Sequence, residues 1–153
     1  MNRVVLALSI LVALMFASVS VDEPEFLLLH IYEASIYVIL AAFLYFGREE
    51  WAYPLGMILP VVWILLSFLT GRLQAGFRQF GLLVGRQEVS NLTSLLAVGI
   101  TISGLALAAA SAFYYHKEIH GSITAGPKNF ALGAVISLAY YAVLVLWFTA
   151  AVS

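Results

Sequence analysis

Two ionisable side chains lie inside the second apolar stretch of the chain. His30 and Glu33 are spaced so that a helix would place both on one face, and Tyr37 continues that face. An ionisable group at the centre of a bilayer costs about 2.5–3.5 kcal/mol on insertion scales, so such residues are candidates for function. We therefore take His30, Glu33 and Tyr37 as the candidate cofactor-binding set.

Three uses fit the chemistry of this face. The neutral imidazole of His30 could ligate the iron of a haem b or the magnesium of a chlorophyll-type pigment. His30 and Glu33 could instead relay protons or bind a cation, as a small transporter or membrane enzyme would require. In the third use, both side chains hydrogen-bond to a neighbouring helix or partner, or extend to the membrane interface. Bound lipids are a further cofactor class to expect.

A second pair of histidines, His116 and His120, has the spacing of two ligands on one helix face and could hold a metal ion. Gly121 follows His120 directly and Lys117 adds positive charge, which is typical of a helix end entering a loop. Basic side chains there interact with the last free carbonyls. We expect the helix end and keep the metal site as the alternative.

Other catalytic chemistry has no residues to support it. The chain has no cysteine, which excludes disulfides, thiolate metal sites, iron–sulfur clusters and a cysteine nucleophile. It also lacks the serine-hydrolase, zinc-protease, phosphate-binding-loop and dinucleotide-binding motifs. An enzyme is therefore the less expected class.

Composition identifies the environment of the chain. Hydrophobic residues make up 63% and charged residues 10% of its 153 residues, and its mean hydropathy is +1.03. A soluble domain is about 45–50% apolar and about 25% charged. Lipid must therefore solvate most of this chain. A net charge of −1 gives no attraction to nucleic acid.

Apolar runs separated by short polar breaks predict an all-α integral membrane protein, a single bundle over 1–153. A bilayer core of about 30 Å needs about 20 apolar residues per helix. Five stretches meet or approach this length, and they are residues 4–21, 26–46, 54–70, 91–115 and 130–152.

The first stretch has a second interpretation. Arg3, an apolar run and the small residues Ser18 and Ser20 resemble a secretory signal peptide, whose cleavage would leave four spans. We expect a retained helix.

Residues 72–89 mix arginines with large apolar side chains, which is typical of an interfacial segment. Ser90 or Asn91 then provides an N-cap for the following helix. Lysine and arginine are divided almost evenly between the two ends of the bundle, so orientation stays open.

Small residues at helical spacing mark the last two spans. Such faces allow close backbone approach, which drives helix association in lipid. They could pack within this bundle or dock against another membrane subunit, and the residues are Gly99, Ser103, Gly104, Ala108, Gly133 and Ser137.

One stretch resembles a known family. Arg86, the run Glu88-Val89-Ser90-Asn91-Leu92 and the glycine-containing helix that follows are similar to a segment of photosystem I subunit XI, and residues 129–133 are loosely like its last helix. The histidine–glycine motif that precedes this segment in the family is absent here, and this chain has two extra spans. No pigment ligand is therefore carried over.

Three functional hypotheses follow for a multi-pass protein of a bacterial inner membrane or an organelle membrane. The first is a small, non-catalytic accessory subunit of a larger complex, such as a respiratory or photosynthetic electron-transfer complex. The second is a haem- or pigment-binding protein that uses His30. The third is a small transporter or membrane enzyme built on His30, Glu33 and Tyr37.

Overall fold

The structure, a computed structural model, describes residues 2–118 and 126–152 and is helical almost throughout. Five of its helices are long and apolar enough to cross a membrane, which confirms the predicted five-span, integral, multi-pass membrane protein. A short 3-10 turn, Pro24–Phe26, separates the first two helices. Within the described ranges the α-helices are α1 (Arg3–Asp22), α2 (Leu27–Tyr45), α3 (Glu49–Leu69), α4 (Arg72–Val84), α5 (Leu92–Glu118) and α6 (Gly126–Val152).

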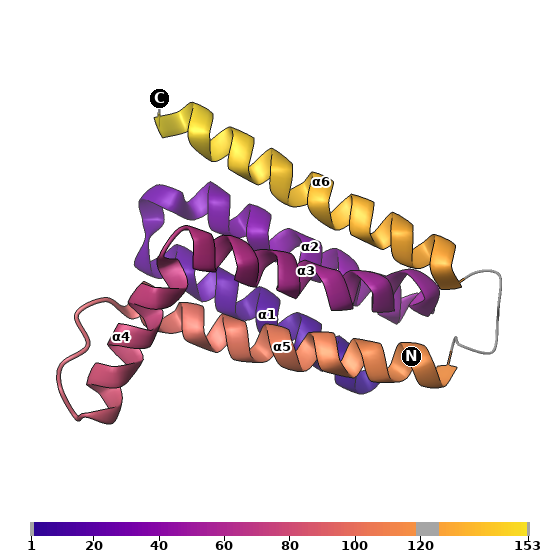
Figure 1. Cartoon of the computed structure of the whole chain (residues 1–153), viewed down its shortest axis with the longest axis horizontal. Helices are drawn as coiled ribbons and strands as arrows, with labels where there is room; N and C mark the ends of the chain where they lie inside the picture. The colour runs from indigo at the N-terminus through magenta and orange to yellow at the C-terminus, as the bar shows by residue number, and fades with distance from the viewer. Residues whose placement is uncertain (1, 119–125, 153) are drawn as a thin grey trace.

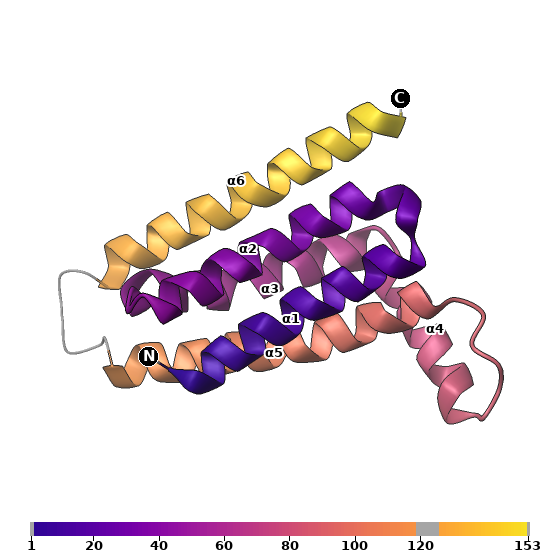
Figure 2. The ribbon, with the colours of Figure 1, turned by 180° about the vertical axis from the view of Figure 1, so that it is seen from behind.

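The spans run antiparallel and pack side by side (Figure 1). Helix α1 packs against α2 and α5, and α3 packs against α5 and α6. The view from behind shows that α6 lies on the outside of the bundle and leans away from α2 and α3 towards its C-terminal end (Figure 2). The α1–α2 turn, α4 and the C-terminus all lie at that end of the bundle.

Helix α1 supplies part of the bundle core. Val12, Phe16 and Val19 are completely buried. The ring of Phe16 stacks on Tyr37 with centroids 5.6 Å apart and meets Trp63 edge-on at 5.4 Å. The stretch that resembles a signal peptide therefore positions residues of the second and third spans.

Helix α3 begins at Glu49 rather than at Pro54, where the apolar run begins. Glu49 and Glu50 occupy its first turn, where negative charge interacts favourably with the helix dipole. Pro54 and Pro60 are both inside the helix, and each freed carbonyl can be satisfied by neighbouring groups, as is common in membrane helices.

These two prolines pack against glycines of neighbouring spans. A Cβ atom at Gly133 of α6 would lie 2.9 Å from Cβ of Pro54, and one at Gly104 of α5 would lie 3.1 Å from Cβ of Pro60. The absence of a side chain at Gly133 and Gly104 therefore allows α3 to approach α6 and α5 closely.

Other small residues also pack inside the chain. A Cβ atom at Gly99 would lie 2.6 Å from Cε of Met15, and the Ser103 hydroxyl lies 3.4 Å from the Met15 sulfur. Ser137 is completely buried, and Ala108 is half-buried. The sequence predicts that these small residues either pack within the bundle or dock against another subunit. Their contacts in the structure are packing contacts within the bundle.

Helix α4 leaves the bundle at an angle (Figure 1). Gly71 adopts a left-handed conformation, with φ of +77°, at the turn between α3 and α4. Leu73 and Gly76 are buried, whereas Phe77 and Phe80 are exposed. Residues 72–84 are thus an amphipathic helix, in agreement with the mixture of arginine and apolar side chains that suggests an interfacial segment.

The start of α5 is held by side-chain caps. The backbone N–H of Ser94 donates to the side-chain oxygen of Asn91 at 2.6 Å, which confirms Asn91 as the N-cap. The side-chain oxygen of Gln79 accepts from the backbone N–H of Ser90 at 3.0 Å, so α4 is fastened to the same point.

Candidate functional site

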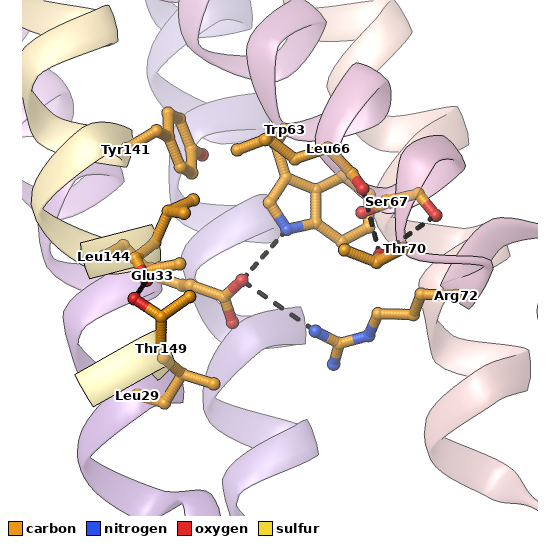
Figure 3. Close-up of a pocket in the computed structure, with 11 residues that line it drawn as sticks. Leu29, Glu33, Trp63, Leu66, Ser67, Thr70, Arg72, Tyr141, Leu144 and Thr149 are labelled. Carbon is orange, nitrogen blue, oxygen red and sulfur yellow. Dashed lines mark hydrogen bonds and ion pairs between the residues drawn. The ribbon is translucent and has the colours of Figure 1, made fainter. Parts of the chain in front are cut away.

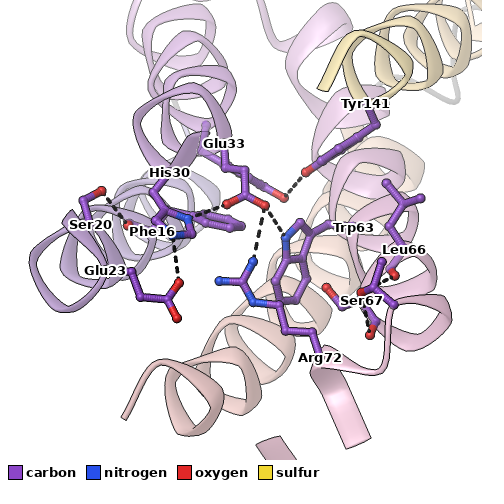
Figure 4. Close-up of polar contacts among 12 residues, drawn as sticks. Phe16, Ser20, Glu23, His30, Glu33, Trp63, Leu66, Ser67, Arg72 and Tyr141 are labelled. Carbon is purple, nitrogen blue, oxygen red and sulfur yellow. Dashed lines mark hydrogen bonds and ion pairs between the residues drawn. The ribbon is translucent and has the colours of Figure 1, made fainter. Parts of the chain in front are cut away.

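Helix α2 presents His30 and Glu33 towards the interior, close to the α1–α2 turn. Their exposed fractions are only 1% and 3%. Nδ1 of His30 lies 2.9 Å from Oε2 of Glu33, so the two side chains form a direct hydrogen bond (Figure 4). The helical spacing therefore places the two groups together, as expected from the sequence.

Glu33 receives further donors from two other helices. The indole Nε1–H of Trp63, on α3, donates to Oε1 at 3.1 Å. Nη1 of Arg72, the first residue of α4, lies 3.9 Å from the same oxygen. A buried carboxylate is stable only when hydrogen bonds and opposite charge compensate for lost hydration. The hydrogen bonds from α2 and α3 and the nearby positive charge on α4 provide that compensation.

A second carboxylate lies on the other side of the imidazole. Nε2 of His30 is 3.3 Å from Oε2 of Glu23, whose side chain is 30% exposed. Ionised carboxylates only accept hydrogen bonds, and only the protonated imidazole donates from both nitrogens. Glu23, His30 and Glu33 thus form a continuous polar chain from the bundle surface to the buried carboxylate.

The same geometry bears on the haem and chlorophyll hypothesis. An axial imidazole ligand needs one nitrogen directed at the metal. Both nitrogens of His30 face carboxylates here, so a metal at Nε2 would have to displace Glu23. A haem or pigment on His30 stays a prediction.

Tyr37, the third residue of the candidate face, is buried above this group. Its hydroxyl lies 3.4 Å from the hydroxyl of Tyr141 on α6, and its ring stacks on Phe16. Tyr37 thus connects α2 to α6 through Tyr141 and to α1 through Phe16.

A cavity of about 460 Å³ adjoins Glu33 and is bounded by α2, α3, α4 and α6 (Figure 3). This volume falls within the range of about 300–1,000 Å³ that is typical of small-molecule sites. Most of its wall is apolar, with charged and hydroxyl groups interspersed. The lining residues are Leu29, Glu33, Trp63, Leu66, Ser67, Thr70, Arg72, Tyr141, Leu144, Val145 and Thr149.

Helix α6 forms one side of the cavity. It is attached to α2 near the middle of its length, through Tyr140. The ring of Tyr140 stacks on Tyr32 of α2 with centroids 4.2 Å apart. The Tyr32 hydroxyl donates to the carbonyl of Tyr140 at 3.1 Å, and the Tyr140 hydroxyl donates to the carbonyl of Tyr32. Beyond this attachment α6 leans outwards, and Leu144, Val145 and Thr149 face the cavity.

The first histidine of the second pair, His116, lies at the opposite end of the bundle from the α1–α2 turn. His116 is exposed in the last turn of α5 beside Lys117, and His120 lies outside the described residues. Among residues 2–118 and 126–152, no three histidine, aspartate or glutamate side chains converge where they could hold a metal ion. A metal at His116 and His120 stays a prediction.

Three residues that help to form the site are not among the candidates that the sequence predicts. They are Trp63, Arg72 and Tyr141. Trp63 and Tyr141 lie within spans, away from the interfacial belts where these residue types gather. Arg72 is the first cation after the third span. These positions were visible in the sequence, but nothing in it showed that all three residues would lie around the same cavity as Glu33.

Comparison of the chain with protein-family models, with curated proteins and with solved structures finds no match.

Proposed function

We propose that this protein binds a small, largely apolar molecule from the bilayer in the cavity beside Glu33. The observation that carries the proposal is the buried carboxylate at the wall of an apolar cavity within the spans. A membrane protein avoids buried charge unless it serves a purpose, and a mostly apolar pocket with few polar groups is typical of a ligand site.

Ligand binding is the step that the hypothesis of a small transporter or membrane enzyme requires. In the proposal, Glu33 is the polar anchor of the site and His30 orients its carboxylate through the 2.9 Å hydrogen bond. Trp63 contributes both a wall and a second donor to Glu33.

Trp63 also provides the test. The chain has three tryptophans, and Trp51→Phe with Trp147→Phe leaves Trp63 as the single fluorescent reporter. We expect brominated alkyl chains, added to the protein in detergent micelles, to quench Trp63 fluorescence in a saturable way. Unbrominated chains of the same length should compete. Linear quenching without saturation or competition would exclude the site.

A cavity-filling pair of variants locates the binding. Val145→Phe places a ring in the cavity wall. It should weaken the binding affinity, measured by the saturable quenching, at least about tenfold. Val143→Phe is the matched control, because Val143 is on the same helix, is 54% exposed and does not line the cavity. Equal behaviour of both variants would place the bound chain elsewhere.

An accessory subunit of a larger complex is our second proposal, and α6 favours it. This helix is the least buried of the five candidate spans, with Leu138 and Leu146 exposed at 59% and 68%. A neighbouring subunit against this face would give α6 the packing that the other spans obtain within the chain.

Native mass tests the second proposal. The tagged protein is extracted from its own membrane in mild detergent, and its mass is compared with the 16.7 kDa of the chain. A mass far above a small multiple of this value supports a subunit docked on α6 if it is lost in Leu138→Trp but retained in Leu14→Trp. Leu14 is the matched control because its side chain on α1 is 59% exposed. A homogeneous monomer contradicts it.

A further inference from the structure

We infer that the ligand of the cavity is an uncharged amphiphile whose head both donates a hydrogen bond to Glu33 and accepts one from Arg72. The inference rests on the proposed function and adds the chemical class of the ligand. It follows from three features of the site: adjacent donor and acceptor groups, the balance of charge around them, and the apolar remainder of the wall.

The donor and the acceptor lie side by side. Figure 3 shows the Glu33 carboxylate and the Arg72 guanidinium directed at each other across one end of the cavity. Their separation of 3.9 Å is long for a hydrogen bond. Nη2 of Arg72 is buried and has no hydrogen-bond partner in the part of the chain that the structure describes. Arg72 therefore has donor capacity that no described residue uses.

Charge balance disfavours an anionic head. A second carboxylate or a phosphate beside Arg72 would also lie beside Glu33, and Glu23 is only one imidazole further away. One guanidinium would then face several negative groups in a region of low dielectric, where like charges repel strongly.

A cationic head is disfavoured for the complementary reason. Glu33 already faces N–H groups of His30, Trp63 and Arg72. Glu33 is the only acidic one among the described residues that line the cavity, so an ammonium group would find no further anion in the wall to neutralise it, and the Arg72 guanidinium would repel it. A hydroxyl head avoids both costs, since it donates to the free lone pair of Glu33 and accepts from Arg72.

The rest of the wall fits an alkyl chain or ring system. Leu29, Leu66, Leu144 and Val145 supply apolar surface. The hydroxyls of Thr70 and Thr149 donate to carbonyls of their own helices, so they add little competing polarity. The cavity is thus polar at the end occupied by Glu33 and Arg72 and mostly apolar elsewhere.

The test uses the protein with Trp63 as its only tryptophan and four brominated probes of equal chain length. Their heads are a primary alcohol, a methyl ether, a carboxylate and a trimethylammonium group. We expect the alcohol to bind at least about tenfold more tightly than the ether, which cannot donate, as the loss of one buried hydrogen bond predicts. The two charged probes should bind more weakly than the alcohol.

The four probes separate the inference from the proposed function. Equal saturable quenching by all four overturns the inference on the head group and leaves the cavity as a binding site. Tightest binding of the carboxylate or the ammonium probe overturns the inference and assigns a charged ligand. Absence of saturable quenching by every probe contradicts the proposed function itself.

A variant of Arg72 checks the assignment of the acceptor contact. Arg72→Met should abolish the preference for the ether over an unsubstituted bromoalkane, because the ether only accepts a hydrogen bond. It should reduce but not abolish the preference for the alcohol, which still donates to Glu33. Arg78→Met, an exposed position on the same helix that does not line the cavity, should leave both preferences unchanged. Equal preference in both variants would overturn the role of Arg72, and thermal unfolding of each shows that it is folded.

Discussion

The indole N–H of Trp63 donates a hydrogen bond to the carboxylate of Glu33 at 3.1 Å, between two side chains that are each only 3% exposed. This contact joins α3 to α2 inside the membrane-spanning bundle. It keeps the carboxylate at the cavity wall, where a ligand would meet it.

Trp63→Phe should destabilise the protein by about 1–3 kcal/mol, because a buried charged acceptor loses one donor while most of the aromatic packing is kept. Thermal unfolding in detergent, followed by circular dichroism, measures the change. Trp147→Phe is the control, since Trp147 is 42% exposed and its ring meets Tyr32 of α2 edge-on at a centroid distance of 6.4 Å, away from the buried carboxylate. Equal losses in the two variants would contradict a special role for the Trp63 contact.

His30→Leu should cost about 2–4 kcal/mol of folding free energy, because it leaves the buried Glu33 without its closest donor. Glu23→Gln should cost less than about 1 kcal/mol, since this side chain is partly exposed and its contact with Nε2 of His30 is longer, at 3.3 Å. Denaturation in mixed micelles measures both. The prediction fails if Glu23→Gln is the more damaging of the two.

Gly56→Ala should destabilise the contact between α3 and α5 by about 1–3 kcal/mol. A Cβ atom there would lie 2.3 Å from Oγ of Ser111. That hydroxyl is buried and has no hydrogen-bond partner among the described residues, so Ser111→Ala alone should be neutral or stabilising.

The double variant Gly56→Ala/Ser111→Ala should recover most of the stability lost in Gly56→Ala, because the clashing oxygen is gone. A double-mutant cycle of unfolding temperatures tests this. Strict additivity of the two changes would show that the residues do not contact each other.

Gly71→Ala should destabilise the protein by about 1–2 kcal/mol, since φ is +77° and a Cβ atom is strained there. It should also weaken the saturable quenching of Trp63, because Gly71 directs the turn that brings Arg72 to Glu33.

Gly81→Ala, on the same helix as Arg72, is the control for this variant. No atom lies within 4 Å of its added Cβ, so alanine should stabilise the helix by about 0.5–1 kcal/mol. Destabilisation by both alanines would indicate that α4 is sensitive for another reason.

The sequence by itself determined the class of the protein and the local arrangement along each helix. Composition required lipid as the solvent, and the lengths of the apolar runs predicted five spans. The position of His30 and Glu33 on one face follows from helical periodicity, and the Asn91 cap follows from the preference of a helix start for a side-chain acceptor. All of these features depend on residues close together in the chain.

Only the tertiary structure decided which residues surround Glu33 and the cavity beside it. Trp63, Arg72 and Tyr141 come from three other helices, and their meeting depends on how each helix is rotated and inclined against α2. Apolar side chains surround the spans on nearly every side, so hydrophobic periodicity does not specify that rotation in lipid. Close contacts such as Pro54 against Gly133 specify it instead. They hold α6 near α3 at one end and leave the space at the other end that becomes the cavity.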